Sequence, residues 1–186
     1  SFLMLQCFAK NLITQEENYM KLQNKKITIF LFGIYFAALI WIILFKMDLS
    51  ILSFRQPRSM NLIPFSASAI SNGAIDLSEL LNNILIFIPC GIYACMLLPE
   101  CSFFIKVLPA FFISLGLELF QFLLAVGACD ITDLINNTFG GIIGIILYWI
   151  FSKIFKKHTN AIINLLAFTA TTLMLAFIAI LLIGNA

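Results

Sequence analysis

The charged residues of this chain are confined to short stretches, and long apolar segments separate them. Five segments of 19 to 28 residues hold a single charge between them: residues 27–45, 80–99, 107–129, 134–152 and 159–186. That charge is Glu118. About 20 apolar helical residues cross a hydrocarbon core of about 30 Å. Each segment is therefore long enough to span a bilayer.

The alternative of a soluble helical bundle fails because its helices would each need a polar face. Residues 27–45 are apolar all round, and only 11% of the chain is charged, against about 25% in soluble domains. This composition excludes a soluble enzyme with a charged surface and a disordered chain. The net charge of +2 is too small to indicate a nucleic-acid partner. We predict an all-α, polytopic integral membrane protein with five transmembrane helices, in the cell membrane and with the lipid bilayer as its partner.

The distribution of lysine and arginine predicts the orientation, because cytoplasmic loops are enriched in basic residues. With a cytoplasmic N-terminus, eight basic residues lie inside and three, Lys46, Arg55 and Arg58, lie outside. We therefore expect a cytoplasmic N-terminal segment at residues 1–26, a membrane domain of four spans at 27–155 and a fifth transmembrane helix at 159–186. The loop at residues 46–79 is compatible with an interfacial helix or a re-entrant turn. The chain begins at Ser1, and Met4 and Met20 are candidate natural starts.

Cysteine and histidine offer little chemistry here. The five cysteines form no C-x-x-C pair, so we interpret them as apolar fillers and predict no metal and no cofactor. His158 is the only histidine and lies in a lysine cluster, which excludes a histidine-based dyad or triad within the chain.

Glu118 is the carboxylate that lies deep in a predicted span. Placing a carboxylate near the bilayer centre costs about 2.5–3.5 kcal/mol, so such a residue usually faces other helices or a water-filled cavity. Ser114, Glu118 and Gln121 follow the spacing i, i+4, i+7 and share one helix face. Gln121 can donate hydrogen bonds to the carboxylate or to a ligand. Two interpretations stay open: a functional pocket, or a polar clasp that only fixes helix packing.

More polar residues gather where the fourth predicted span begins. Asp130 or Thr132 can cap this helix and Asp133 suits its positive end, but capping does not account for Asn136 and Asn137 as well. The predicted topology places Asn61, Asn82 and Asn83 at the same outer level. We predict that the ligand-binding residues are Asn61, Asn83, Glu118, Gln121, Asp133 and Asn137.

Two further patterns concern packing. Gly140 and Gly144 form a G-x-x-x-G step, which allows helix backbones to approach closely. Pro89 with Gly91 is expected to kink or loosen its span and to free a carbonyl that needs a partner.

Four motifs, taken in order, resemble those of the VanZ-like family of bacterial membrane proteins. They are Asn61-Leu62-Ile63-Pro64-Phe65, the N-x-x-x-F-x-P-x-G run from Asn83 to Gly91, Glu118-x-x-Gln121, and Asp130-x-x-Asp133 continuing to Gly140-Gly141. Together they cover about residues 61–144. In one respect this sequence departs from the family, which often has an arginine after the glycine at the Gly127 position. This chain has Ala128 and Cys129 there.

The family takes its name from a protein associated with teicoplanin resistance, and most members have no assigned activity. The resemblance and the polar residues together lead us to expect a non-enzymatic protein that binds an amphiphile, either a lipoglycopeptide or a lipid-linked envelope precursor. It would contribute to glycopeptide resistance or envelope homeostasis.

Two other classes stay open. One is an intramembrane hydrolase or transferase acting on a lipid-linked substrate, in which Glu118 would be the general base and Asp130 and Asp133 would hold a divalent cation. The other is a transporter or flippase, which would need a polar path through the cytoplasmic half, where this sequence shows little polarity.

Overall fold

The computed structural model describes residues 2–45, 60–64, 70–71, 74–75, 77–125 and 129–184. The helices are α1 (Phe2–Phe45), α2 (Leu77–Leu97), α3 (Phe103–Leu124), α4 (Ile131–Phe155) and α5 (Thr159–Gly184), with a 3-10 helix, η3 (Lys156–His158), between the last two. The strands are β1 (Met60–Asn61), β2 (Ile70–Ser71), β3 (Ala74–Ile75) and β4 (Cys129–Asp130), each of two residues. The predicted all-α class is confirmed for the described residues. The departure of the family-like motif at Gly127 and Ala128 lies outside them, as does most of the 46–79 loop.

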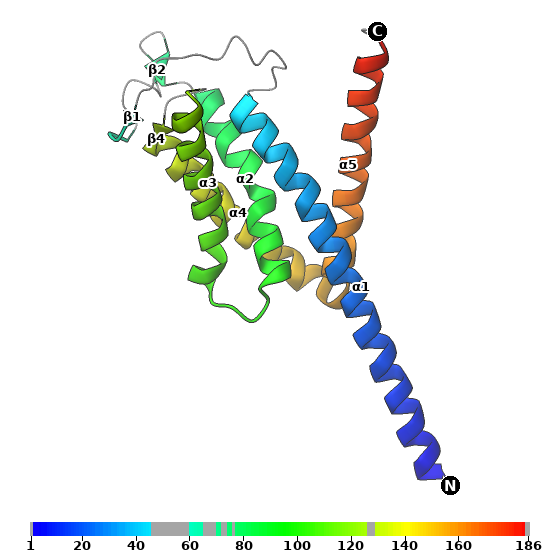
Figure 1. Ribbon diagram of the computed structural model, residues 1–186. Coiled ribbons are helices and arrows are strands. Elements are labelled where there is room, and N and C mark those ends of the chain that lie inside the picture. The colour runs from blue at the N-terminus through cyan, green and yellow to red at the C-terminus, as the bar shows by residue number, and fades with distance from the viewer. Residues whose placement is uncertain are drawn as a thin grey trace.

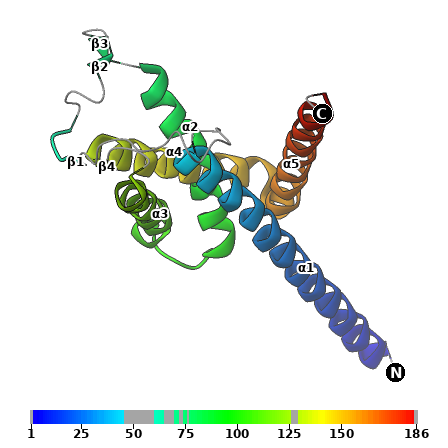
Figure 2. The same ribbon diagram turned by 45° about the horizontal axis from the view of Figure 1, so that its top comes forward.

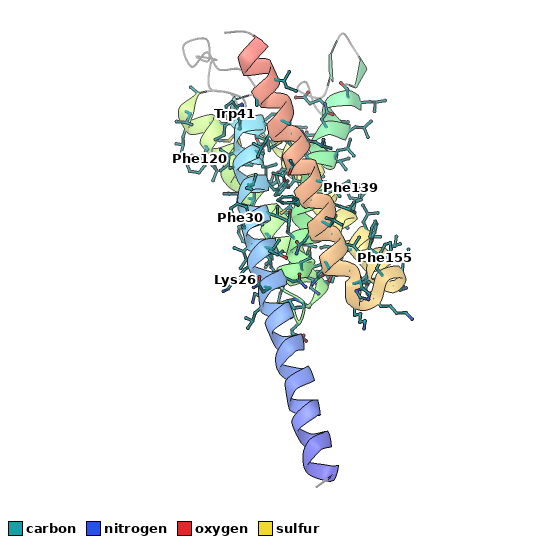
Figure 3. The ribbon with its side chains drawn as sticks, turned by 90° about the vertical axis from the view of Figure 1, so that its right-hand side faces the viewer. Lys26, Phe30, Trp41, Phe120, Phe139 and Phe155 are labelled. Atoms are coloured by element: carbon teal, nitrogen blue, oxygen red, sulfur yellow. The ribbon has the colours of Figure 1, made fainter. Side chains whose placement is uncertain are left out.

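Two ends of the helix bundle serve as reference points below (Figure 1). The strand end is where β1 and β4 pair in parallel, with Met60 opposite Cys129 and Asn61 opposite Asp130. The turn end holds the α2–α3 turn at residues 98–102 and η3. Figure 3 places Trp41 and Phe120 toward the strand end, whereas Lys26 and Phe155 lie toward the turn end.

In the part of the chain that the structure describes, four helical stretches are long and apolar enough to cross a membrane: Leu22–Leu44, Leu77–Leu97, Phe103–Leu124 and Ile131–Ala176. The fourth, of 46 residues, contains α4, η3 and most of α5. The 44 residues of α1 extend about 66 Å at 1.5 Å per residue, and the N-terminal part projects beyond the other helices (Figures 1 and 2).

The distribution of side chains is the reverse of that in a soluble protein. Phe30 is 66% exposed and Leu173 is 71% exposed, whereas Glu118 is 2% exposed. Ser114, Asn136 and Asn137 are buried as well. An exposed apolar exterior around a polar interior suits a hydrocarbon solvent, and we therefore describe the chain as a membrane protein.

Glycines hold α2 against α4. A Cβ on Gly140 would collide with the carbonyl oxygen of Ile84, and one on Gly144 with that of Ile88. Gly91 on α2 meets the carbonyl oxygen of Gly141 in the same way. The close approach predicted from the G-x-x-x-G step is confirmed, and it aligns the first turns of α2 and α4 at the strand end.

Hydrogen bonds attach α1 to the rest of the bundle. The Tyr35 hydroxyl donates to the Ile86 carbonyl at 2.8 Å, next to the Leu85 carbonyl that Pro89 leaves without its helical donor. Near the turn end, the Asn164 amide of α5 donates to the Thr28 hydroxyl at 3.0 Å and to the Asn24 carbonyl at 3.2 Å. From this crossing α5 diverges from α1 toward its C-terminus (Figure 1).

Candidate functional site

Glu118 lies on the inner face of α3, in the half of the helix nearer the strand end. Its Oε2 accepts a hydrogen bond of 2.8 Å from the backbone N–H of Asp130, at the start of α4. A buried carboxylate needs such donors, because burial without hydrogen bonds is costly. This contact joins α3 to the N-cap residue of α4.

Asp130 connects three segments. Its carboxylate caps α4 by accepting a 2.8 Å hydrogen bond from the Thr132 N–H, which confirms one of the two caps considered from the sequence. The other carboxylate oxygen accepts from the Asn61 side chain at 3.2 Å, across the β1–β4 pair. Asn61 is thereby brought beside the start of α4 from 69 residues away in the chain.

A second link joins α2 to α4. The Asn83 amide donates to Oδ1 of Asp133 at 2.6 Å. The glycine contacts described above bring these two helices close enough for this hydrogen bond between short side chains.

Two asparagines, Asn136 and Asn137, lie on the buried face of α4, farther along the helix than Asp133. The Asn137 amide nitrogen donates to the Ser114 hydroxyl on α3 at 2.9 Å. Within the described part of the chain, Oδ1 of Asn137 and Nδ2 of Asn136 are buried without a hydrogen-bond partner. Each buried polar atom without a hydrogen-bond partner lowers the stability of the fold by about 1–3 kcal/mol. A ligand or a water molecule that bonds to these two atoms would remove that cost.

Gln121 has a different contact from the one predicted. Its amide donates to the Ile43 carbonyl of α1 at 2.9 Å, and no hydrogen bond between it and Glu118 is among those of the described residues. Ile43 lies in the last turn of the described part of α1. Gln121 therefore attaches α1 to α3 at the strand end.

We define the polar cluster as the strand-end residues that make these contacts together with the buried Asn136: Asn61, Asn83, Ser114, Glu118, Asp130, Asp133, Asn136 and Asn137. Five of the six predicted ligand-binding residues are in it, and Gln121 borders it. Ligand binding by these residues stays a prediction. The β1–β4 pair was not predicted, because two-residue strands carry no readable periodicity.

Cys129 borders the cluster on β4, outside the helices. Partial burial raises the pKa of its thiol, and the carboxylates of Glu118 and Asp130 raise it further. A thiol with a raised pKa is mostly protonated at neutral pH and is a weak nucleophile.

The arrangement of possible metal ligands does not support the alternative of an intramembrane enzyme with a divalent cation at Asp130 and Asp133. Among the described residues, no group of three or more histidine, cysteine, aspartate or glutamate side chains is placed to hold a metal ion. The carboxylates of Asp130 and Asp133 instead accept hydrogen bonds from Asn61 and Asn83.

Comparison with known proteins now adds to the geometry. The family model described as VanZ/LLP1 matches residues 32–155, two thirds of the chain. The chain belongs to the VanZ/LLP1 family. The resemblance seen in the sequence motifs is thus confirmed. The chain is also 39% identical over 132 residues to Protein VanZ from Enterococcus faecium, which covers 70% of this chain and 76% of that protein. No solved structure matches it.

The whole polar cluster lies within the residues that match the VanZ/LLP1 model. By contrast, η3 and α5 begin after the matched residues end. The candidate site therefore belongs to the part of the chain shared with the family, and α5 lies beyond it.

Proposed function

We propose that this VanZ/LLP1 protein is a multi-pass protein of the cell membrane with five spans, in which α4 and α5 cross separately. As one straight helix, the stretch Ile131–Ala176 would be about 69 Å long at 1.5 Å per residue, more than twice the thickness of a hydrocarbon core. Between its halves, η3 carries Lys156, Lys157 and His158, which suit the membrane surface. In Figure 1, α5 also turns back toward the strand end after η3.

We further propose that the N-terminus is cytoplasmic and that the strand end faces outward. The exposed lysines at the turn end support this orientation, since Lys26, Lys153 and Lys157 lie on segments that meet there. Basic residues mark the cytoplasmic side of membrane proteins. With this orientation, the polar cluster lies in the outer half of the membrane domain.

The proposed function is binding of an amphiphile at the polar cluster, either a lipoglycopeptide such as teicoplanin or a lipid-linked envelope precursor. The observation that carries this proposal is a pair of buried atoms, Asn136 Nδ2 and Asn137 Oδ1, that have no hydrogen-bond partner among the described residues. Asn137 contacts Ser114, which lies one turn of α3 from the buried Glu118 carboxylate. A clasp that served only to pack helices would gain by satisfying every polar atom. The cluster instead keeps hydrogen-bonding capacity for another molecule.

The chemistry of the cluster indicates which part of the ligand it would recognise. Three carboxylates, Glu118, Asp130 and Asp133, make it rich in acceptors. Such a site suits sugar hydroxyls, peptide N–H groups and ammonium groups, which both ligand types carry. Around the cluster, exposed apolar side chains such as Phe120 and Phe139 offer a surface for an acyl tail. By binding such a molecule, the protein would contribute to glycopeptide resistance or envelope homeostasis.

The test replaces Glu118 by Gln and Asp133 by Asn together. Both changes keep the shape of the side chain and remove its charge. We expect an expressing strain to lose protection against teicoplanin, measured as the minimum inhibitory concentration, because the ligand loses its charged acceptors.

The matched control is Glu100→Gln, which removes a carboxylate that is exposed in the α2–α3 turn at the opposite end. It should leave susceptibility at the wild-type level, with equal amounts of each protein in the membrane by immunoblot. Unchanged susceptibility in the Glu118→Gln/Asp133→Asn strain would contradict the proposal.

A further inference from the structure

A second candidate site lies away from the polar cluster, toward the turn end. A groove with a volume of about 270 Å³ opens between α2, α4 and α5. Its walls are aliphatic and aromatic, and they include Pro89, Tyr93, Leu147, Phe151, Ile163 and Ala167. This volume is just below the roughly 300–1,000 Å³ of small-molecule pockets, so it suits a section of a flexible chain.

A hydrogen bond between α4 and α5 fixes the two helices next to the groove. The Tyr148 hydroxyl of α4 donates to the side-chain oxygen of Asn160 on α5 at 2.9 Å. This hydrogen bond holds the two helices together beside η3, while farther along they diverge (Figure 1). The packing of α2, α4 and α5 therefore forms the groove. Within a membrane, the surroundings of an apolar groove are lipid acyl chains, which would fill it.

Three lysines follow the groove wall in the sequence, where α4 passes into η3. Lys153, Lys156 and Lys157 are exposed, and they follow Phe151 of the groove wall within six residues. Five helical residues from Phe151 to Lys156 cover about 8 Å, so the lysines reach the level where a lipid with its chain in the groove carries its phosphate. Lys153 also lies 5.6 Å from the centre of the Trp149 ring, an arrangement typical of the membrane interface.

Lys156 lies where α4 passes into η3 and has a left-handed φ. Lys156 has a φ of 49° and a ψ of −121°, a conformation that favours glycine and strains a residue with a side chain. Lys156 is the C-cap of α4, and its backbone N–H donates to the Ser152 carbonyl, so this conformation belongs to the turn into η3 that carries Lys156 and Lys157.

We propose that this groove binds an anionic phospholipid, with one acyl chain between α2, α4 and α5 and the phosphate held by Lys153, Lys156 and Lys157. The apolar walls account for the chain, and the lysines select a negative headgroup over a zwitterionic one. The site is distinct from the polar cluster, and α5, Lys156 and Lys157 lie outside the residues that match the family model. With the orientation proposed above, the lipid lies in the cytoplasmic leaflet.

The experiment uses the purified full chain in detergent with an equimolar mixture of phosphatidylglycerol and phosphatidylcholine that have identical acyl chains. Native mass spectrometry then counts the bound lipids. We expect the wild-type chain to retain phosphatidylglycerol preferentially. Lys156→Gln/Lys157→Gln should lower that preference by roughly fivefold for each lysine. The control, Lys25→Gln/Lys26→Gln, removes two exposed lysines from α1 and should keep the wild-type ratio.

Two more variants separate the parts of the proposal from a failure to fold. Lys156→Gly relieves the backbone strain and should still lower the preference roughly fivefold. Ala167→Phe fills the groove and should lower the binding of both lipids. Wild-type lipid ratios in both lysine variants, or undiminished binding in Ala167→Phe, would overturn the proposal.

Discussion

At the scale of single residues, Glu118 combines a high cost with few compensating donors. Placing a carboxylate at this depth costs about 2.5–3.5 kcal/mol, and a hydrogen bond to a charged group returns about 1.5–3 kcal/mol. The Asp130 N–H supplies one such bond. An apolar side chain of similar size would pack these helices without the cost of burying a carboxylate. Glu118 lies one helical turn from Ser114, the partner of Asn137, and Asn137 Oδ1 has no hydrogen-bond partner among the described residues, which favours a binding role.

Cys129 provides a chemical probe of this charge. Burial raises the pKa of its thiol, and the charges on Glu118 and Asp130 raise it further. Maleimides react with the thiolate, whose fraction grows tenfold per pH unit below the pKa. We predict that Glu118→Gln lowers the pKa of Cys129 and therefore increases its labelling rate at a given pH.

The rate is measured by mass spectrometry of the Cys129 peptide across a pH series. Glu100→Gln at the opposite end should leave the labelling profile unchanged. If the Glu118→Gln and wild-type profiles coincide, Glu118 exerts no electrostatic effect on the strand end.

At the scale of helices, the α2–α4 contact positions the cluster. Asn83 and Asp133 meet because Gly91, Gly140 and Gly144 let the two backbones approach. The register of one helix on the other thus sets the geometry of the site.

We predict that Gly144→Ala destabilises the protein by about 1–3 kcal/mol, since its Cβ would collide with the Ile88 carbonyl oxygen. Gly116→Ala is the control, because a Cβ there meets nothing within 4 Å, and it should stabilise α3 by roughly 0.5–1 kcal/mol. The measurement is the free energy of unfolding during titration with sodium dodecyl sulfate. Equal effects of the two substitutions would show that the glycine contact is not tight.

Sequence patterns predicted the apolar helices and the contact between α2 and α4. They did not predict the hydrogen bonds between distant segments. Apolar runs such as 80–99 are readable because hydrocarbon demands uninterrupted apolar helices. The G-x-x-x-G step is readable because close helix contact needs small residues. The partner of Gln121 could not be predicted, because it depends on how α1 packs against α3, and the local sequence carries no signal for that contact. The pairing of Asn61 with Asp130 depends on a contact between distant segments that has no local signal.

At the scale of the whole molecule, the account depends on the two ends of the bundle facing different sides of the membrane. Native cysteines mark each end: Cys129 lies at the strand end and Cys101 in the α2–α3 turn, and both are partly exposed. We predict that a membrane-impermeant maleimide applied to intact cells labels Cys129 and leaves Cys101 unlabelled.

Permeabilising the cells should then expose Cys101 to the reagent, which controls for its reactivity. Labelling of Cys101 rather than Cys129 in intact cells would place the polar cluster on the cytoplasmic face. That result would reverse the proposed orientation.

The most direct test of the central claim is ligand binding to the purified full chain in lipid nanodiscs. The probes are teicoplanin, the same glycopeptide without its acyl chain, and a lipid-linked disaccharide-pentapeptide precursor. Binding is measured by isothermal titration calorimetry for the wild-type chain, Glu118→Gln/Asp133→Asn and Glu100→Gln. The account predicts saturable binding of an acylated probe, weakened at least about tenfold in the double variant and unchanged in Glu100→Gln, because each charged hydrogen bond contributes about 1.5–3 kcal/mol. Equal affinity of the double variant and the wild-type chain, or no saturable binding of any probe, would contradict it.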